Sequence, residues 1–282
     1  MEKKFFYAQV PPLRFGKDLA HGWRYQIPAY RIAPHVWNVG GQDDVAVYLL
    51  DTGKGLILLD SGYFESVYMV VDRIHRLGFD PKDVKHILLT HWHGDHVNGA
   101  SALQSLSGAK IWLSREDERI HQLHPEGLPG MVNPEYTVDC LYDDGKPIEL
   151  GRFSIRTRLC PGHTPGVTSF FFEDTDDQTG ETFRCAMHGG IGVYPMMTEE
   201  WLKKDGATAE QVYRFISDCE ELSHRPVDIC LASHMNQGNV LPNLPEDLND
   251  YRVFIADYAW ADILLDRARA AMDLYPEKYG RQ

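Results

Sequence analysis

The six-residue segment His91–His96, with the sequence H-W-H-G-D-H, constrains the fold of this chain more than any other feature. It follows the apolar run 85–90, which predicts a buried strand. In an extended segment the first two histidines point to the same side and can reach one ion. If a helix starts near Asp95, the next two side chains diverge by about 100° and can turn to a neighbouring ion. We favour a metal centre over a histidine-rich surface turn, because four potential ligands stand together at the end of a strand.

Apolar runs and turn residues predict strands and helices in alternation. A hairpin is expected from strands 45–50 and 56–60, followed by a helix over 66–77. The other expected elements are a helix over 95–106, strands over 109–113, 153–159, 167–172, 182–187 and 227–232, and helices near 114–122, 198–204, 208–222 and 246–274. This order favours a layered α/β architecture. The stretch 121–147, rich in Pro, Gly and Asp, is expected to be a loop or lid over a site.

Length and charge narrow the function classes. A chain of 282 residues can fold as one large domain. Its net charge of −13 argues against nucleic acid as a partner, because phosphate binding needs a basic face. No apolar run approaches the roughly 18 residues that span a bilayer, and no signal peptide is recognisable. Five cysteines without C-x-x-C spacing suggest a reduced compartment. We therefore expect a cytoplasmic protein acting on a small molecule without membrane contact, and we leave its oligomeric state open.

Three further motifs accompany the histidine-rich segment. They are Leu58–Gly62 (L-L-D-S-G), Cys160–Gly166 (C-P-G-H-T-P-G) and Ala232–His234 (A-S-H). Together with H-x-H-x-D-H, and in this order over roughly 40–240, they resemble the metallo-β-lactamase superfamily. The resemblance implies a four-layer αββα sandwich in one domain over 1–282. It divides this domain into an N-terminal extension (1–40), a catalytic core (41–240) and a helical C-terminal segment (241–282).

The resemblance also implies a complete set of metal ligands. A first zinc ion would take His91, His93 and His163, and a second would take Asp95, His96 and His234. This pattern is similar to the β-lactamase subclass that uses no cysteine ligand. Zinc accepts both imidazole nitrogen and carboxylate oxygen, so two zinc ions are the expected cofactors. Asp60 is expected to accept the other ring N–H of a ligand histidine and fix its orientation.

One position departs from the family pattern. Thioesterases, lactonases and phosphodiesterases of the family place a metal-bridging Asp where this chain has His188. A neutral imidazole cannot bridge two cations, so His188 is expected to ligate one zinc terminally, to face substrate, or to be satisfied by backbone near the pocket. Gly94 stands where the di-iron redox members carry Glu, which disfavours oxygen chemistry.

The sequence indicates the residues of the substrate pocket less clearly than it indicates the metal ligands. Tyr194 and Asn236 are the expected contacts, because they follow the His188 turn and the last ligand. Met196, Met197 and Trp201 could form a pocket wall, but residues of this kind are more often core. His121 and His124 in the expected lid are weaker candidates.

The function implied is zinc-dependent hydrolysis of a carbonyl–heteroatom bond by metal-activated hydroxide, with Asp95 orienting the nucleophile. A β-lactam-like amide or a lactone ranks ahead of a thioester because the bridging Asp is absent. The alternatives are a thioester hydrolase of glyoxalase II type, a nuclease of the same fold, which the negative charge disfavours, and a metal-binding member of the fold without turnover.

Overall fold

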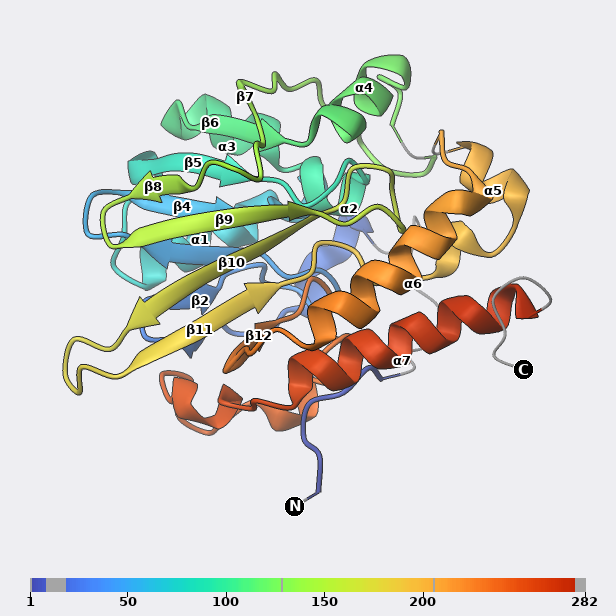
Figure 1. The fold of residues 1–282 in the computed structure, drawn as a ribbon. Coiled ribbons are helices and arrows are strands. Elements are labelled where there is room, and N and C mark those ends of the chain that lie inside the picture. The colour runs from blue at the N-terminus through green and yellow to red at the C-terminus, as the bar shows by residue number, and fades with distance from the viewer. Residues whose placement is uncertain (1, 9–18, 128, 205, 277–282) are drawn as a thin grey trace.

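The computed structural model describes residues 2–8, 19–127, 129–204 and 206–276, and its centre consists of two β-sheets (Figure 1). The first sheet has the order β1-β2-β3-β4-β5-β6-β7, formed by Tyr30–Ala33, Val36–Asn38, Tyr48–Asp51, Leu56–Leu59, Val84–Leu88, Lys110–Leu113 and Cys140–Leu141. The second has the order β12-β11-β10-β9-β8, formed by Ile229–Leu231, Thr182–Met187, Thr168–Thr175, Phe153–Leu159 and Ile148–Leu150. Strands β1 to β4 pair antiparallel, and β4 to β7 pair parallel.

Alternation of side chains along the strands builds the layers. In β3, Leu50 belongs to the core between the sheets, while Leu49 packs on the outer face of the first sheet. In β10, Phe170 and Phe172 point to the shared core, and Phe171 points outward to the other helical layer. Each sheet therefore buries both faces.

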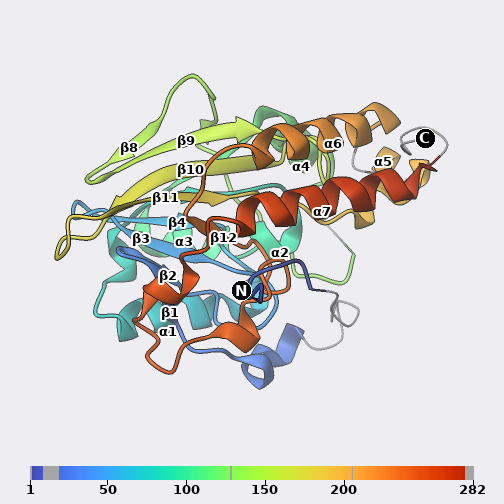
Figure 2. The same cartoon turned by 60° about the horizontal axis from the view of Figure 1, so that its bottom comes forward.

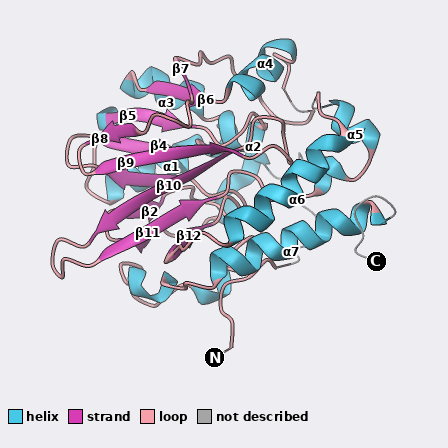
Figure 3. Ribbon diagram, viewed as in Figure 1, coloured by secondary structure: helices cyan, strands magenta, loops and turns pink. Residues whose placement is uncertain are grey.

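The helices cover the two outer faces (Figures 2 and 3). Residues of α1 (Val67–Arg76) and α3 (Ala100–Ser107) pack on the first sheet, and residues of α6 (Ala209–Ser223) and α7 (Ala259–Leu274) pack on the second. The remaining helices are α2 (Gly94–Val97), α4 (Arg115–Leu123) and α5 (Glu199–Lys204), with 3-10 turns at Leu19–Tyr25, Phe64–Ser66, Pro81–Asp83, Tyr194–Met196, Leu241–Asn243 and Tyr251–Phe254. The expected four-layer αββα sandwich with a helical C-terminal segment is confirmed.

The helix expected over 95–106 is two helices, which corrects the sequence interpretation. The carbonyl of His96 accepts hydrogen bonds from the backbone N and the hydroxyl of Ser61, at 2.9 and 2.7 Å. A Cβ at Gly99 would lie 2.3 Å from the Ser61 carbonyl oxygen, so this close approach requires glycine. Docking on the turn after β4 therefore interrupts the helix between α2 and α3.

The expected strand 45–50 and helix 246–274 also begin later than predicted. Residues 45–47 pair elsewhere: Val45 bridges His234, and Ala46 N donates to Ser233 O at 2.9 Å. Before α7, Ala256 N donates to Asp228 O at 2.8 Å, so the chain there follows the second sheet. Both differences arise from contacts between segments far apart in sequence.

The sequence interpretation missed four short strands. Strands β1 and β2 lie within the expected N-terminal extension, yet they join the first sheet. Strand β7 lies within the stretch 121–147, which otherwise contains the end of α4 and irregular backbone. Strand β8 continues the second sheet beside β9. Among the described residues, no helix is long and apolar enough to cross a membrane.

Phe170 tests the packing between the sheets. Its side chain is fully buried in the shared core, so Phe170→Ala should lower the free energy of unfolding by about 3–5 kcal/mol. Tyr213→Ala, at a position 60% exposed on α6, should change it by less than about 0.5 kcal/mol. Urea unfolding of both variants is the measurement. Equal, small losses in the two variants would contradict this core.

Candidate metal centre

The six candidate ligands come from three segments at one edge of the sandwich. His91, His93, Asp95 and His96 follow β5, His163 lies between β9 and β10, and His234 follows β12. The Val45–His234 bridge joins the last of these segments to the first sheet. The two sheets thus bring together residues separated by more than 140 positions.

His91, His93 and His163 form the first group, and their candidate ligand atoms all lie within 4.8 Å of one another. Nδ1 of His93 stands 3.0 Å from Nε2 of His163. Nε2 of His91 is buried and has no hydrogen-bond partner among the residues that the structure describes. A buried nitrogen without a partner is costly unless something else binds it.

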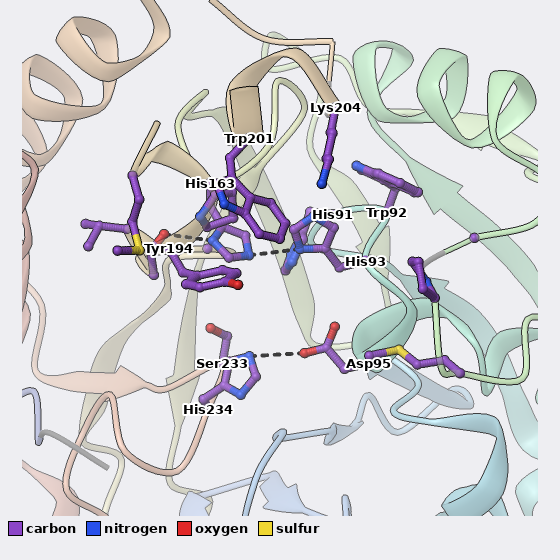
Figure 4. Close-up of a pocket in the computed structure, with 18 of the residues that line it drawn as sticks. His91, Trp92, His93, Asp95, His163, Tyr194, Trp201, Lys204, Ser233 and His234 are labelled. Atoms are coloured by element: carbon purple, nitrogen blue, oxygen red, sulfur yellow. Dashed lines mark hydrogen bonds and ion pairs between the residues drawn. The ribbon is translucent and has the colours of Figure 1, made fainter. Parts of the chain in front are cut away.

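Asp95, His96 and His234 form the second group, again within 4.8 Å. Nε2 of His96 and Nε2 of His234 are 3.1 Å apart, and Oδ2 of Asp95 is 3.4 Å from each (Figure 4 shows the Asp95–His234 contact). Four ligands at about 2.0–2.1 Å from a tetrahedral ion stand about 3.3 Å apart. The spacing of this group therefore fits one ion of zinc's size.

The hydrogen bonds of the outer ring nitrogens show why a cation fits. His96 donates through Nδ1 to Asp60 at 2.7 Å, and His234 donates through Nδ1 to Asp44 at 3.1 Å. These bonds leave Nε2 as the ring nitrogen of each histidine that can bind an ion. Nε2 of both rings and a carboxylate oxygen of Asp95 consequently face one point. A divalent cation at that point would bind all three atoms.

The first group is oriented in the same way. His163 donates through Nδ1 to the carbonyl of Gly192 at 2.7 Å. His91 Nδ1 lies 2.9 Å from the hydroxyl of Thr90, which donates onward to Asp60 at 3.0 Å. These outer partners leave Nε2 of both rings facing the site, as metal ligation requires. The rings of His91 and His96 are 4.1 Å apart, so the two groups are neighbours.

Asp60 is the buried hub of the centre. Its carboxylate accepts from Thr90 N at 2.7 Å, from the Thr90 hydroxyl and from His96. Its backbone has φ 61°, in the left-handed region that non-glycine residues rarely adopt. The hydrogen bond from Asp60 N to Leu88 O, 2.9 Å long, ties this unusual turn to β5. Asp60 thus contacts His96, one of the proposed ligand histidines.

The electrostatics favour positive charge in the second group. Burial lowers the pKa of His96, but Asp95 and Asp60 outweigh burial and raise it to about 10. Burial and the neighbouring imidazoles hold the pKa of His91 well below its usual value. His91 is therefore a neutral ring with a lone pair, while the second group attracts a cation.

Asp117 is a structural support that the sequence interpretation missed. It is fully buried on α4 and accepts from Trp92 N at 2.9 Å, Thr164 Oγ1 at 2.7 Å and Gly166 N at 2.6 Å. Burial raises the pKa of Asp117 to about 6, although these hydrogen bonds lower it. Asp117 thus joins the segment of His93 to the loop that carries His163. Nothing in its helical sequence context distinguishes it from its acidic neighbours.

A cavity of about 840 Å³ opens over the two groups. Tyr194 and Asn236, the expected substrate contacts, both line it. Met197 and Trp201 also line it, whereas Met196 is fully buried in the helical layer. The stretch 121–147 contributes a wall through His124, Glu126, Gly127, Pro129 and Met131, as expected of a lid.

Two glycine positions shape the centre. A Cβ at Gly190 would lie 3.0 Å from the Cβ of His163, so the chain beside this ligand has little room for a side chain. A Cβ at Gly94 would lie 2.6 Å from Asn98 Nδ2 and 2.8 Å from Met131 Sδ. A larger residue at position 94, such as the Glu of the redox members, would require these neighbours to move.

The structure does not bring His188 into either group. Its ring is 4% exposed, packs edge-on to Phe215 at 6.2 Å and accepts through Nδ1 from Gly190 N at 3.3 Å. Burial lowers the pKa of His188 to about 3, so the ring is neutral. Within the described part of the chain, its Nε2 has no hydrogen-bond partner, and the residue is not among those that line the cavity. Of the three expectations for His188, the structure is nearest to a buried histidine that contacts backbone close to the pocket.

The family follows from comparison with known proteins. The model of the metallo-beta-lactamase superfamily matches residues 40–177. A probable metallo-hydrolase of Burkholderia pseudomallei (strain 1710b) is 31% identical over 209 residues, which cover 69% of each chain. This chain belongs to the metallo-β-lactamase superfamily.

Other relatives match over shorter stretches. The probable polyketide biosynthesis zinc-dependent hydrolase BaeB of Bacillus velezensis is 31% identical over 43% of this chain and 47% of its own length. The hydroxyacylglutathione hydrolase GloC of Haemophilus influenzae is 30% identical over 50% of this chain and 66% of its own length. The chain thus spans about half of BaeB and about two thirds of GloC.

Solved structures show the same fold over nearly the whole chain. The metallo-beta-lactamase FEZ-1 of Legionella gormanii has a TM-score of 0.78 and 25% identity, covering 90% of this chain and 97% of that one. The subclass B3 metallo-beta-lactamase BJP-1 of Bradyrhizobium japonicum has a TM-score of 0.76 at 22% identity, covering 92% and 96%. The similarity to BJP-1 concerns the fold alone.

Asp117 provides the test of this centre. Asp117→Asn removes one of the two carboxylate oxygens that hold the ligand segments, so metal affinity at His91, His93 and His163 should fall about 10- to 100-fold. Titration with zinc against a competing chelator measures this change. Glu116→Gln, at an exposed position of the same helix, is the matched control. Equal affinity in both variants would show that Asp117 does not support the centre.

Proposed function

We propose that this protein is a dinuclear zinc hydrolase that cleaves a carbonyl–heteroatom bond. The observation that carries the proposal is the convergence of three candidate ligand atoms of the second group on one point. Beside it lies a first group with a buried nitrogen that has no hydrogen-bond partner among the described residues. Both groups supply ligands to the wall of one cavity, so substrate can reach them.

His91, His93 and His163 would hold one ion, and Asp95, His96 and His234 would hold the other. Two bound zinc ions would supply a water acidic enough to ionise near neutral pH and a positive charge beside the substrate carbonyl. Three protein ligands for each ion leave a position open, as a catalytic zinc site needs. The outer contacts to Asp60, Asp44 and Gly192 keep the rings in ligand orientation.

Asp95 is the proposed catalytic residue of the chain. Its carboxylate lines the cavity and faces His96 and His234, which hold its pKa well below the usual value although burial raises it. It remains an acceptor at neutral pH and can orient the attacking water through a hydrogen bond. Asp95 would therefore direct the nucleophile at the carbonyl carbon.

The cavity favours a small organic substrate. Its walls carry aromatic and sulfur side chains such as Trp92, Tyr194 and Met131, which bind apolar surface and exclude water. We propose Tyr194 and Asn236 as substrate contacts. A polynucleotide fits this cavity and the net charge of −13 poorly.

Among carbonyl compounds we propose a cyclic amide or a lactone. Position 188 offers no carboxylate to bridge two ions, and His188 is not among the described residues that line the cavity. The structural similarity to metallo-beta-lactamases over nine tenths of the chain supports the same choice. A thioester is the second candidate, favoured by the match to a hydroxyacylglutathione hydrolase.

A panel assay tests the function. The protein loaded with zinc should contain two ions per chain and hydrolyse at least one of a β-lactam, a lactone and a thioester, assayed side by side. Activity should disappear with a chelator and return with zinc. An active preparation that contains iron and no zinc would contradict the proposal.

Asp95→Asn is the matched variant for this assay. It keeps the size of the side chain, so folding should be retained while turnover falls by two orders of magnitude or more, since removal of one positioned catalytic group typically costs about 10²–10⁴. Circular dichroism and metal analysis separate misfolding and ion loss from loss of turnover. Full turnover with two bound ions would exclude the proposed role of Asp95.

A further inference from the structure

The rim of the cavity exposes large apolar side chains on one side. Tyr194, Met197 and Trp201 come from the 3-10 turn after β11 and from α5, and they are 54%, 48% and 36% exposed. Residues this large and apolar usually gather at a surface because they bind something. The rings of Tyr194 and Trp201 contact each other at 4.9 Å, so they form one continuous apolar wall.

Two lysines of α5 line the same cavity, although the protein as a whole is strongly acidic. Lys203 and Lys204 are exposed, and among the described residues no carboxylate forms an ion pair with either ammonium group. Glu126 is the carboxylate of the opposite wall. It interacts with Nδ1 of His124 at 3.3 Å and its side chain is 69% exposed. The lysines therefore place positive charge at the cavity wall without an ion-pair partner among the described residues.

The ammonium group of Lys204 contacts the ring of Trp201. Its Nζ lies 4.3 Å from the centre of the Trp201 ring, a cation–π distance. Figure 4 shows Trp201 and Lys204 extending from the same side of the cavity, with the ammonium end of Lys204 directed inward. An ammonium held over an aromatic ring keeps donors available for a further acceptor, because the ring accepts no strong hydrogen bond.

We propose that Lys204, positioned by Trp201, binds an anionic group of the substrate, and that the substrate is therefore an acyl compound with an apolar body and a carboxylate or similar anion. That the substrate is an acyl compound rests on the proposed hydrolytic function. The scissile carbonyl would stand at the six ligand residues, the apolar body along Tyr194 and Trp201, and the anion at Lys204. Charge and apolar surface thus select amphiphilic anions over neutral compounds.

A pair of fluorescent dyes tests this selection without turnover. 8-Anilinonaphthalene-1-sulfonate is an apolar anion, and N-phenyl-1-naphthylamine is the same molecule without the sulfonate. Lys204→Met should raise the Kd of the anionic dye about fivefold and leave the Kd of the neutral dye unchanged, as expected for loss of one partly exposed charge contact. The effect should vanish at about 1 M salt, where the screening length is only about 3 Å.

Lys110→Met is the matched control. Lys110 is an exposed lysine at the start of β6, outside the cavity lining, and its removal changes the net charge by the same amount. It should alter neither Kd. In Lys204→Met the neighbouring Lys203 could bind the anion instead. The double variant Lys203→Met/Lys204→Met removes both ammonium groups and so tests this case. An unchanged ratio of the two Kd values in the double variant would overturn the proposal.

A second pair of compounds connects the site to catalysis. Mono-(4-nitrophenyl) adipate and 4-nitrophenyl hexanoate share an ester and a chain length, and only the former carries a carboxylate. Lys204→Met should lower kcat/KM for the charged ester about fivefold, mainly through KM, and spare the neutral ester. If wild-type protein cleaves neither ester, the hydrolytic function is in question while the dye result still decides the anion site. Equal loss for both esters would assign Lys204 a structural role.

Discussion

The carboxylate of Asp60 connects the segments of the candidate metal centre. It is fully buried at the end of β4, in a left-handed backbone conformation, and it binds both Thr90 and His96. Through the Thr90 hydroxyl it also reaches His91, so one carboxylate orients a ligand in each group. A buried carboxylate is stable only when hydrogen bonds satisfy it, which makes the arrangement of Asp60 and the ligand segment mutually dependent.

The same reasoning explains why the centre needs a rigid scaffold. Candidate ligand atoms that stand 3.0–3.4 Å apart fit an ion only while that spacing is kept. The two sheets hold the candidate ligand segments, and Asp117 and the Val45–His234 bridge connect these segments to one another. Asp95 is the one carboxylate among the six proposed ligands, and the proposed mechanism therefore gives it the central chemical role.

The layered α/β architecture and the four candidate ligands after β5 could be inferred because they depend on local sequence, whereas His163 and His234 were expected only from the family resemblance. Strand β5 and the ligands after it are adjacent in the chain, and the strands show their apolar runs directly. Other features depend on contacts between distant segments. The interruption between α2 and α3 needs the Ser61–His96 hydrogen bonds, and the support by Asp117 needs α4 to meet the His163 loop. Trp201 and Lys204 belong to the site only because α5 folds over it, and no local pattern distinguishes a wall of a cavity from a core.

The most direct test of this account is anomalous diffraction at the zinc absorption edge from crystals of the zinc-loaded protein. The account predicts two peaks, one bounded by His91, His93 and His163 and one by Asp95, His96 and His234, each about 2.0–2.2 Å from its ligand atoms. Two neighbouring peaks at these positions would establish the dinuclear centre. A single peak, or zinc bound away from the six residues, would contradict it.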